Sequence, residues 1–218
     1  MTDAVVSLGG FPALAGVSLV VREGELVALR GANGTGKTTL LRLCAGLAAL
    51  SRGSAHVLGH DIARQRAAVR KHVGLLGHSN GLYAELTARE NVEFTARLVG
   101  ARRSDVDEAL SRLNIDERVA STRARALSAG QRRRTALASL VVRRARVWLL
   151  DEPHAGLDTQ AREELDRMLS DATGAGATVV YTTHELDSAS RATPRTVTLT
   201  GGTVASDVPA RARSGGSR

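Results

Sequence analysis

The chain has 218 residues, of which 43% are hydrophobic, and its 30 lysine and arginine residues against 22 acids give a formal net charge of +8. That length suits one substantial domain with a real core. Aromatic residues make up only 2% of the chain, and the basic residues, all arginine except Lys37 and Lys71, are spread along it, which disfavours a nucleic-acid surface built on base stacking. No run of about 18 apolar residues and no signal-peptide pattern appears, so we expect a cytosolic protein.

The first elements along the chain are short strands. Apolar runs predict strands over Val5–Leu8 and Val17–Val21, separated by the turn-prone stretch 9–12. A third apolar run, Leu26–Leu29, leads into a glycine-rich stretch, and the helix pattern of Thr39–Leu47 follows. Cys44, the only cysteine, falls on that helix, where we expect a small core residue rather than a reactive thiol.

The glycine-rich stretch has the pattern G-x-x-x-x-G-K-[ST] and predicts a nucleoside triphosphate site. Its residues are Gly31, Ala32, Asn33, Gly34, Thr35, Gly36, Lys37 and Thr38, with Thr39 adjoining. Glycines let backbone N–H groups surround an anion, and the N-terminus of the following helix adds positive potential. Lys37 would reach the β- and γ-phosphates, and Thr38 would bind Mg²⁺. A glycine-rich turn without a ligand is the alternative, which the strand–loop–helix context disfavours.

The rest of the chain alternates between strand and helix patterns around one long helical block. Strand patterns occur at Ala55–Leu58, Val73–Leu76, Val147–Leu150, Thr178–Tyr181, Thr196–Thr200 and Thr203–Ala205. Residues 86–140 are helical in character from the capping-box pattern at Thr87–Glu90 onward, and Gln160–Ser170 is a further amphipathic helix. This order predicts an α/β fold with a mainly parallel sheet, an N-terminal antiparallel β part and an inserted α-helical arm.

Two further motifs contain the residue types that nucleotide hydrolysis needs. Asp151 and Glu152 end an apolar strand pattern. A carboxylate placed there can bind Mg²⁺, the role that we assign to Asp151, and Glu152 could accept a proton from the attacking water. Ser128 lies at a predicted helix start, where its hydroxyl and the free N–H groups form a second potential phosphate site. An ordinary helix cap is the simpler interpretation of that motif taken alone.

Together with two other motifs, these segments resemble the ATP-binding subunits of ABC transporters. The matching segments are the phosphate loop (Walker A), the signature motif Leu127–Gln131, the Walker B strand Val147–Asp151 with Glu152, the D-loop Ala155–Asp158 and the histidine of Thr182-Thr183-His184. They occur in the family's order and cover nearly the whole chain. The resemblance implies a P-loop NTPase with a RecA-like core, with ATP and Mg²⁺ bound and with ATP hydrolysis as the activity.

The resemblance also implies a composite site. Two subunits of this family pair head to tail, and each ATP lies between the Walker A loop of one subunit and the signature motif of the other. Ser128, Ala129, Gly130 and Gln131 would therefore contact the ATP of a partner subunit. That partner is a second copy of the chain or a related ATPase subunit, and the pairing depends on ATP.

Catalytic roles follow from the same resemblance. Glu152 would polarise the attacking water, and His184 would contact the γ-phosphate and stabilise charge in the transition state. Asp158 would connect the two sites across the interface. Thr38 and Asp151 would hold the metal.

Two positions depart from the family pattern. Where the family has a glutamine in the loop that joins the core to the helical arm, this chain has His78; a neutral imidazole can still bond to a metal-bound water. The aromatic residue that stacks on adenine is replaced by Leu8, with Phe11 nearby as the candidate for stacking.

Three segments narrow the resemblance further. The stretches Leu76–His78, Glu85–Asn91 and Leu127–Arg134, with the short chain, are similar to the ATP-binding subunit of the haem exporter of cytochrome c maturation. We therefore expect an ATPase subunit that powers export, with haem as the candidate substrate. The alternatives are an exporter of drugs or lipids and, further away, a soluble ABC-type ATPase acting on nucleic acid or ribosomes. Glu152 and the signature motif disfavour a kinase or a non-hydrolysing switch.

These expectations include a domain plan and a location. A single ABC ATPase domain would cover 1–208, with the core at 1–82 and 142–208 and the helical subdomain at 83–141, and 209–218 would be a disordered tail. The arm would dock onto an integral membrane permease, which places the protein at the cytoplasmic face of the membrane. No specific nucleic-acid partner is expected.

Overall fold

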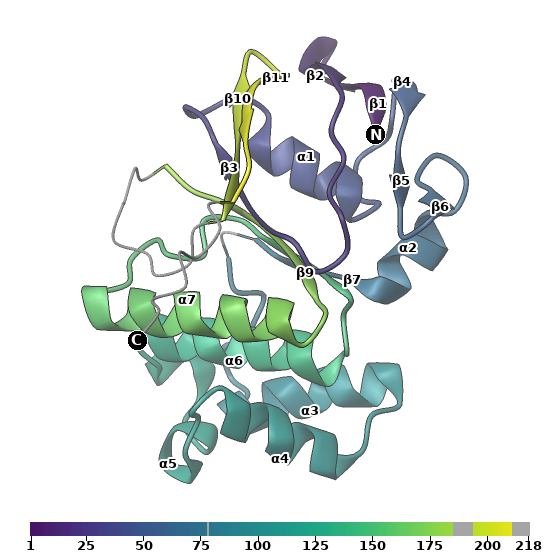
Figure 1. The fold of residues 1–218 in the computed structure, drawn as a ribbon. Helices are drawn as coiled ribbons and strands as arrows, with labels where there is room; N and C mark the ends of the chain where they lie inside the picture. Colours follow the sequence, from purple (N-terminus) through teal and green to yellow (C-terminus); the bar gives the residue numbers. More distant parts are fainter. Residues whose placement is uncertain (78, 185–193, 211–218) are drawn as a thin grey trace, which may run out of the picture.

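The computed structural model describes residues 1–77, 79–184 and 194–210, and a six-stranded sheet lies at the centre of the molecule (Figure 1). Its strands, in spatial order, are β11 (Thr203–Val208), β10 (Arg195–Thr200), β3 (Leu26–Arg30), β9 (Thr178–Thr182), β8 (Val147–Leu150) and β7 (Val73–Leu76). Neighbours from β10 to β7 run parallel, and β11 pairs antiparallel with β10. The predicted mainly parallel α/β sheet is confirmed.

A separate antiparallel sheet contains the N-terminus. Its order is β2 (Phe11–Val17), β1 (Thr2–Leu8) and β4 (Arg52–Ser54). The prediction of a strand over Val17–Val21 is wrong, because the left-handed glycines Gly9 and Gly10 (φ 57° and 85°) close the turn within two residues. The second strand therefore begins at Phe11 and ends at Val17. The strand predicted at Ala55–Leu58 is shorter, since His56–Val57 (β5) forms a small hairpin with His60–Asp61 (β6).

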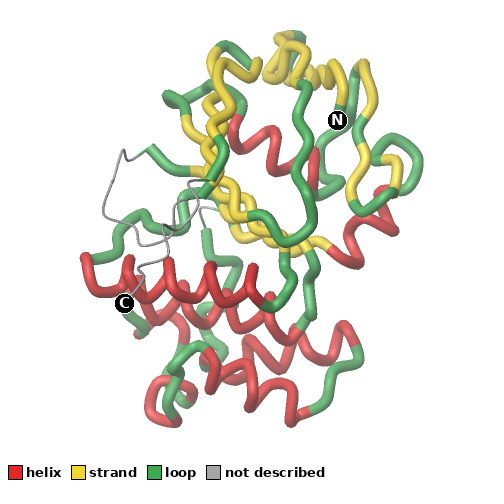
Figure 2. The backbone as a smooth tube through the Cα atoms, viewed as in Figure 1, coloured by secondary structure: helices red, strands yellow, loops and turns green. Residues whose placement is uncertain are grey.

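Most of the helices gather on one side of the central sheet (Figure 2). The helices are α1 (Lys37–Cys44), α2 (Arg66–His72), α3 (Ala88–Val99), α4 (Arg103–Arg112), α5 (Glu117–Ala120), the 3₁₀ turn η1 (Ala124–Ala126), α6 (Ala129–Val142) and α7 (Thr159–Gly174). The predicted capping box is present, since Thr87 accepts the N–H of Glu90 and Glu90 accepts that of Thr87. The segment from α3 to α6 is the predicted helical block, here called the arm.

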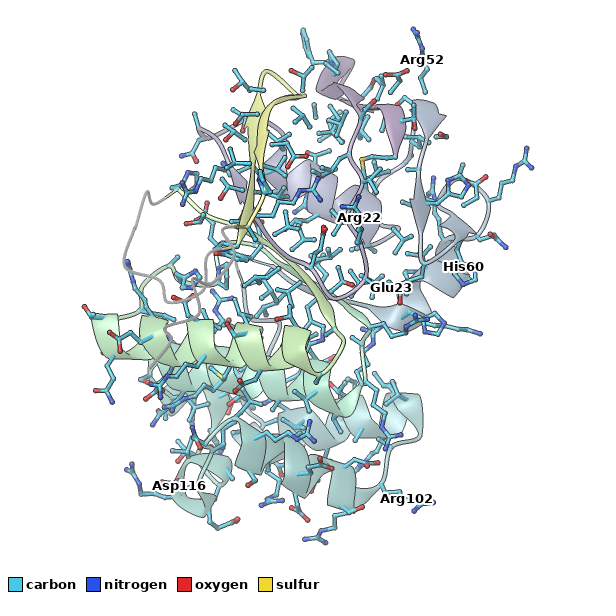
Figure 3. The ribbon with its side chains drawn as sticks, in the orientation of Figure 1. Arg22, Glu23, Arg52, His60, Arg102 and Asp116 are labelled. Atoms are coloured by element: carbon cyan, nitrogen blue, oxygen red, sulfur yellow. The ribbon has the colours of Figure 1, made fainter. Side chains whose placement is uncertain are left out.

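Alternate residues of the buried strands supply two cores on the two faces of the sheet. Trp148 and Leu150 pack with the arm and α7, whereas Leu149 packs with α1 and the antiparallel sheet. Cys44 packs against the second core, and burial raises the pKa of its thiol to about 11, in agreement with a packing role. The labelled side chains of Arg52, Arg102 and Asp116 lie at the exposed periphery of the molecule (Figure 3).

Parallel strands bring the ends of distant segments to one edge of the sheet. Leu29 near the end of β3 pairs with Thr182 at the end of β9, and Leu150 at the end of β8 pairs with Tyr181. The phosphate loop follows β3 and Asp151 follows β8, so both emerge at the same carboxyl edge, where ligands of open α/β sheets bind.

Candidate functional site

The phosphate loop is held open by two glycines that the structure requires. Gly31 has φ 145° and Gly36 has φ 99°. A Cβ atom on Gly31 would lie 2.4 Å from the carbonyl oxygen of Leu199, and one on Gly36 would lie 2.5 Å from the carbonyl oxygen of Ala13. Both distances are too short for real atoms, so these positions exclude larger residues. The loop therefore passes directly from β3 into α1, with N–H groups at the start of the helix free for an anion.

Lys37 lies at the centre of this loop and is only 6% exposed. Its ammonium group donates to the carbonyl oxygens of Gly31 at 2.7 Å and Ala32 at 2.9 Å. Burial lowers the pKa of Lys37, and the negative charges of Glu152 and Asp151 act in the opposite direction. A cation held inside a loop of this shape can transfer its hydrogen bonds to phosphate oxygens.

The carboxylate of Asp151, which follows β8, connects the residue after the phosphate-loop lysine with the end of β9. Its Oδ2 atom accepts the hydroxyl of Thr38 at 2.9 Å, and its Oδ1 atom accepts the hydroxyl of Thr182 at 2.8 Å. The backbone N–H of Asp151 donates to Leu76 at 2.7 Å, and the residue is 8% exposed. Thr38 and Asp151, predicted as metal ligands, are thus brought into direct contact.

Glu152 is held by its backbone in an uncommon conformation. Its φ is 50°, in the left-handed region that costs a residue with a side chain roughly 1–2 kcal/mol. The hydroxyl of Thr182 accepts its backbone N–H at 2.7 Å. The carboxylate is hydrogen-bonded to Nε2 of His184, so the two predicted catalytic residues meet. A strained backbone that aims a carboxylate is a common feature of functional sites.

The signature motif and the D-loop lie side by side, apart from the phosphate loop. Ser128 caps α6 by accepting the N–H of Gln131 at 3.2 Å, and Asp158 caps α7 by accepting the N–H of Ala161 at 2.8 Å. Ser128, Gly130 and Asp158 line one cavity of about 360 Å³. The side chains of Lys37 and Thr38 bond to Gly31, Ala32 and Asp151, and none of these three residues lines this cavity.

Phe11 is not among the residues that these contacts bring together. Phe11 is 79% exposed at the start of β2, the strand that passes the phosphate loop at Ala13. His78 lies outside the described residues. The exposed ring of Phe11 contributes nothing to the core, which leaves its role in stacking as a prediction.

Sequence reasoning missed two residues that the structure places here. Thr182 holds Asp151 and the backbone of Glu152 at once. The pairing of Leu150 with Tyr181 sets the next residues, Asp151 and Thr182, opposite each other, and this register exists only in the folded sheet. Arg133 is 6% exposed, and its guanidinium lies 3.5 Å from the carbonyl oxygen of Glu152. Nothing in a run of three arginines indicated that one of them is buried.

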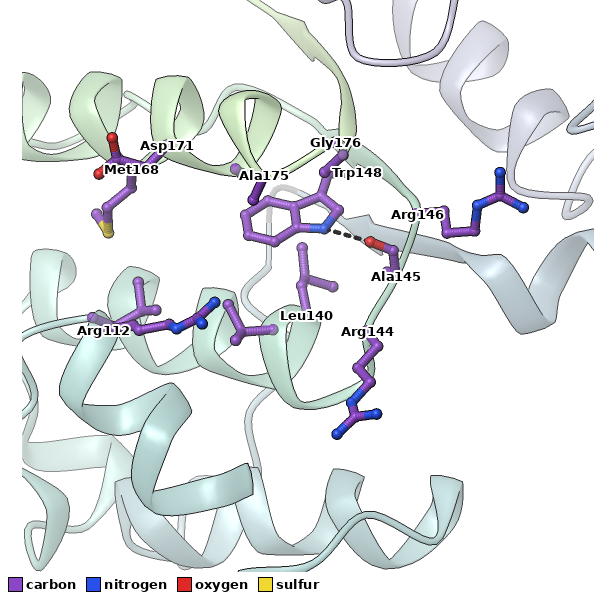
Figure 4. Close-up of a pocket in the computed structure, with 14 residues that line it drawn as sticks. Arg112, Leu140, Arg144, Ala145, Arg146, Trp148, Met168, Asp171, Ala175 and Gly176 are labelled. Atoms are coloured by element: carbon purple, nitrogen blue, oxygen red, sulfur yellow. Dashed lines mark hydrogen bonds between the residues drawn. The ribbon is translucent and has the colours of Figure 1, made fainter. Parts of the chain in front are cut away.

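A further cavity lies elsewhere. It has a volume of about 530 Å³ between the C-terminal ends of α6 and α7. Figure 4 shows the indole of Trp148 facing this space, with its Nε1 donating to Ala145 at 3.0 Å. Leu140 and Met168 also line it, and the guanidinium groups of Arg144 and Arg146 point away. Arg112 and Asp171 also line this cavity, and most of its other lining residues are apolar. The residues predicted to bind a nucleotide, Lys37, Thr38 and Asp151, lie together at the phosphate loop instead.

Comparison with known proteins agrees with this geometry. A family model described as "ABC transporter" matches residues 14–155. The cytochrome c biogenesis ATP-binding export protein CcmA of Cupriavidus necator is 39% identical over 182 residues, covering 83% of this chain and 80% of that protein. CcmA of Salmonella typhi is 40% identical over 191 residues, covering 86% and 89%.

Solved structures share the fold over almost the whole chain. The dimeric structure of MJ0796, a bacterial ABC transporter cassette, has a TM-score of 0.86 at 27% identity and covers 97% of this chain and 98% of its own. The dimeric post-hydrolysis state of MJ0796 bound to ADP and Pi has a TM-score of 0.85 at 26% identity with the same coverage. Because the family model spans more than half of the sequence and the relatives match most of it, the chain belongs to the ABC transporter family and is one of its ATPase subunits.

Proposed function

We propose that the chain uses ATP hydrolysis to drive export of haem through a separate membrane-spanning partner, as a step in cytochrome c biogenesis. The observation that carries the ATPase part is the convergence of Lys37, Thr38, Asp151, Glu152 and His184 at one edge of the sheet. The names of the relatives, which are export proteins of cytochrome c biogenesis, support the transport part. Haem is the substrate class that fits such a role.

The residues present fit a magnesium–ATP complex. Thr38 and Asp151 offer a hydroxyl and a carboxylate oxygen 2.9 Å apart, and Mg²⁺ in nucleotide sites uses one or two such oxygens together with phosphates and waters. When bound, Mg²⁺ would neutralise charge on the β- and γ-phosphates. Lys37 would exchange its two carbonyl partners for phosphate oxygens. Glu152 would accept a proton from the attacking water while His184 holds the γ-phosphate.

The site is proposed to be completed by a second subunit. Ser128 and Gly130 face a cavity away from the phosphate loop of their own chain. A Cβ atom on Gly130 would meet nothing closer than 3.8 Å, so packing within the chain does not require glycine there. A phosphate bound by a partner copy would approach the backbone closely at Gly130, and this close approach would require glycine. Asp158 borders the same cavity and would face the partner.

The arm is proposed to dock onto the membrane partner. A groove of about 270 Å³ lies where β7 meets the arm, and Tyr83 and Phe94 line it with their rings at 5.0 Å in an edge-to-face arrangement. These side chains are 55% and 40% exposed, which suits an apolar segment of another protein. In the part of the chain that the structure describes, no helix is both long and apolar enough to cross a bilayer. Docking would hold the protein at the cytoplasmic face of the membrane.

Affinity purification from detergent-solubilised membranes tests the transport role. We expect an integral membrane protein to be recovered with the wild-type chain, and haem to stimulate ATP hydrolysis by the complex. Phe94→Ser should lose the membrane protein, whereas Leu98→Ser, which changes a 71% exposed residue on the same helix, should keep it. Stimulation by lipids or drugs instead of haem would reject the substrate, and recovery of RNA or ribosomes would reject the transport role.

A further inference from the structure

Three consecutive arginines lie within the first two turns of helix α6, and the side chain of one of them is buried. Arg132 donates to the carbonyl oxygen of Leu127 at 2.7 Å, and Arg134 forms an ion pair with Glu164 at 3.1 Å. Arg133 is only 6% exposed. The three side chains have the same chemistry, so the difference lies in what surrounds Arg133.

The guanidinium of Arg133 reaches two backbone carbonyl groups. Its Nη1 atom lies 3.5 Å from the carbonyl oxygen of Gly77, and its Nη2 atom lies 3.5 Å from that of Glu152. These distances are at the long limit of hydrogen bonding. The planar fork of arginine suits two separate acceptors, which the compact ammonium of lysine cannot reach together.

Burial of the Arg133 guanidinium against two carbonyl oxygens costs desolvation free energy, and these long contacts offset little of it. Burial lowers the pKa of Arg133, and the negative charge of Asp151 acts in the opposite direction. No carboxylate in the described part of the chain forms an ion pair with Arg133. A buried cation without a carboxylate partner contributes little to stability, and an apolar residue of similar size would pack there without that penalty.

One of the two contacts of Arg133 is to Glu152, the residue whose backbone is strained. Glu152 has φ 50°, and Thr182 accepts its N–H at 2.7 Å. Arg133 donates to its carbonyl oxygen. The same oxygen accepts the backbone N–H of Ala155 at 3.1 Å. Each polar group of the Glu152 backbone therefore has one side-chain contact, from Thr182 of the sheet and from Arg133 of the arm, and Arg133 shares the carbonyl oxygen with Ala155.

We propose that Arg133 is a positioning residue that couples the start of the signature helix to the carboxylate of Glu152. Arg133 lies about one turn after Ser128, and its second contact, Gly77, directly follows β7 at the start of the segment that leads toward the arm. A rotation of the arm would move the guanidinium relative to the carbonyl oxygen of Glu152. The carboxylate is aligned for hydrolysis only when the arm holds Arg133 in reach. The proposal rests on the role of Glu152 as the catalytic base.

Replacement of Arg133 by Met removes the donors and keeps most of the volume. We expect Arg133→Met to lower the rate of ATP hydrolysis by about 10-fold or more, because small misplacements of a catalytic group cost that much. ATP affinity, measured by calorimetry, and the melting temperature should stay at the wild-type level or above it. The rate of ATP hydrolysis by Arg133→Lys should lie between the rates of the wild type and of Arg133→Met. Arg112→Met, which removes an exposed arm arginine paired with Glu108, is the matched control and should hydrolyse ATP normally.

A double-mutant cycle separates positioning from a general structural role. If Arg133 acts through Glu152, then Arg133→Met should change the residual rate of a Glu152→Gln variant by less than about 2-fold, although it slows the wild type. Rate losses that multiply would overturn the inference, as would a wild-type rate in Arg133→Met. If Glu152→Gln is slow and Arg133→Met is not, only this inference fails. If Glu152→Gln keeps the wild-type rate, the role proposed for Glu152 fails and the inference fails with it.

Discussion

The hydroxyl of Thr182 donates to Asp151 at 2.8 Å while it accepts the N–H of Glu152 at 2.7 Å, so one buried oxygen orders both acids at the end of β8. Thr182 is fully buried. Its removal would leave a carboxylate oxygen and an N–H group without a protein partner. Each such buried group costs about 1–3 kcal/mol.

Thr182→Val is therefore expected to lower the free energy of unfolding by about 2–6 kcal/mol, since two groups lose their partner, and the rate of ATP hydrolysis by about 10-fold. Urea denaturation and a steady-state assay measure the two effects. Thr178→Val is the matched control at the other end of the same strand, where the hydroxyl accepts the N–H of Gly24 at 3.1 Å. It should destabilise the protein but leave the rate per folded molecule unchanged. Equal rate losses in both variants would mean that Thr182 acts only through stability.

The two lysines of the chain provide a direct test of the phosphate loop. Lys37→Ala removes the buried ammonium group, and because charge-assisted hydrogen bonds are worth about 1.5–3 kcal/mol, ATP affinity should fall by about 10- to 100-fold. Lys71→Ala removes an exposed lysine at the end of α2 and should bind ATP like the wild type. Calorimetric titration with ATP distinguishes the two. Wild-type affinity in Lys37→Ala would contradict the phosphate-loop assignment.

The C-terminal hairpin contains a pH-sensitive contact. Arg195 donates to both carboxylate oxygens of Asp207, at 2.8 Å and 2.6 Å, and this pairing lowers the pKa of Asp207 below its usual 3.8. A lowered acid pKa stabilises the fold above the unfolded-state pKa and loses that effect as pH falls through the folded-state value.

Asp207→Asn should consequently cost about 0.5 kcal/mol at pH 7, a modest value because the carboxylate is 38% exposed. The difference from the wild type should persist down to about pH 4 and vanish at lower pH. Thermal melts of both proteins between pH 7 and pH 2.5 measure it. A difference that grows on acidification would have the wrong sign for this pairing.

Most of the candidate site could be predicted from the sequence, because nucleotide binding and hydrolysis restrict both the type and the spacing of the residues involved. Lys37, Asp151 and Glu152 belong to motifs whose strand and loop contexts were visible in the apolar pattern. The second strand was misplaced because Pro12 extended the expected turn as far as residue 12, whereas the hairpin turn lies wholly within two glycines.

Tertiary contacts account for what the sequence concealed. Thr182 acts through the register between β8 and β9, which is fixed only when the sheet forms. Arg133 is indistinguishable in sequence from Arg132 and Arg134, and only the packing of α6 against the sheet determines which of them is buried. Hydrophobic periodicity can indicate which face of a helix is buried, but it cannot distinguish three adjacent residues of the same type.

We propose that the phosphate loop is half of a site completed by another subunit, with Glu152 as the catalytic base. Analytical ultracentrifugation of Glu152→Gln with Mg²⁺ and ATP tests it most directly. Hydrolysis in this variant should be slower by about 100-fold or more, so that bound ATP persists. Ser128→Arg, added to the same variant, places a bulky cation at the signature motif and serves as the control.

We predict that Glu152→Gln sediments as a dimer with ATP and as a monomer with ADP or without nucleotide. Addition of Ser128→Arg should return it to a monomer while calorimetry still detects ATP binding at Lys37. A Glu152→Gln protein that remains monomeric with saturating ATP, or one that hydrolyses ATP at the wild-type rate, would contradict the claim.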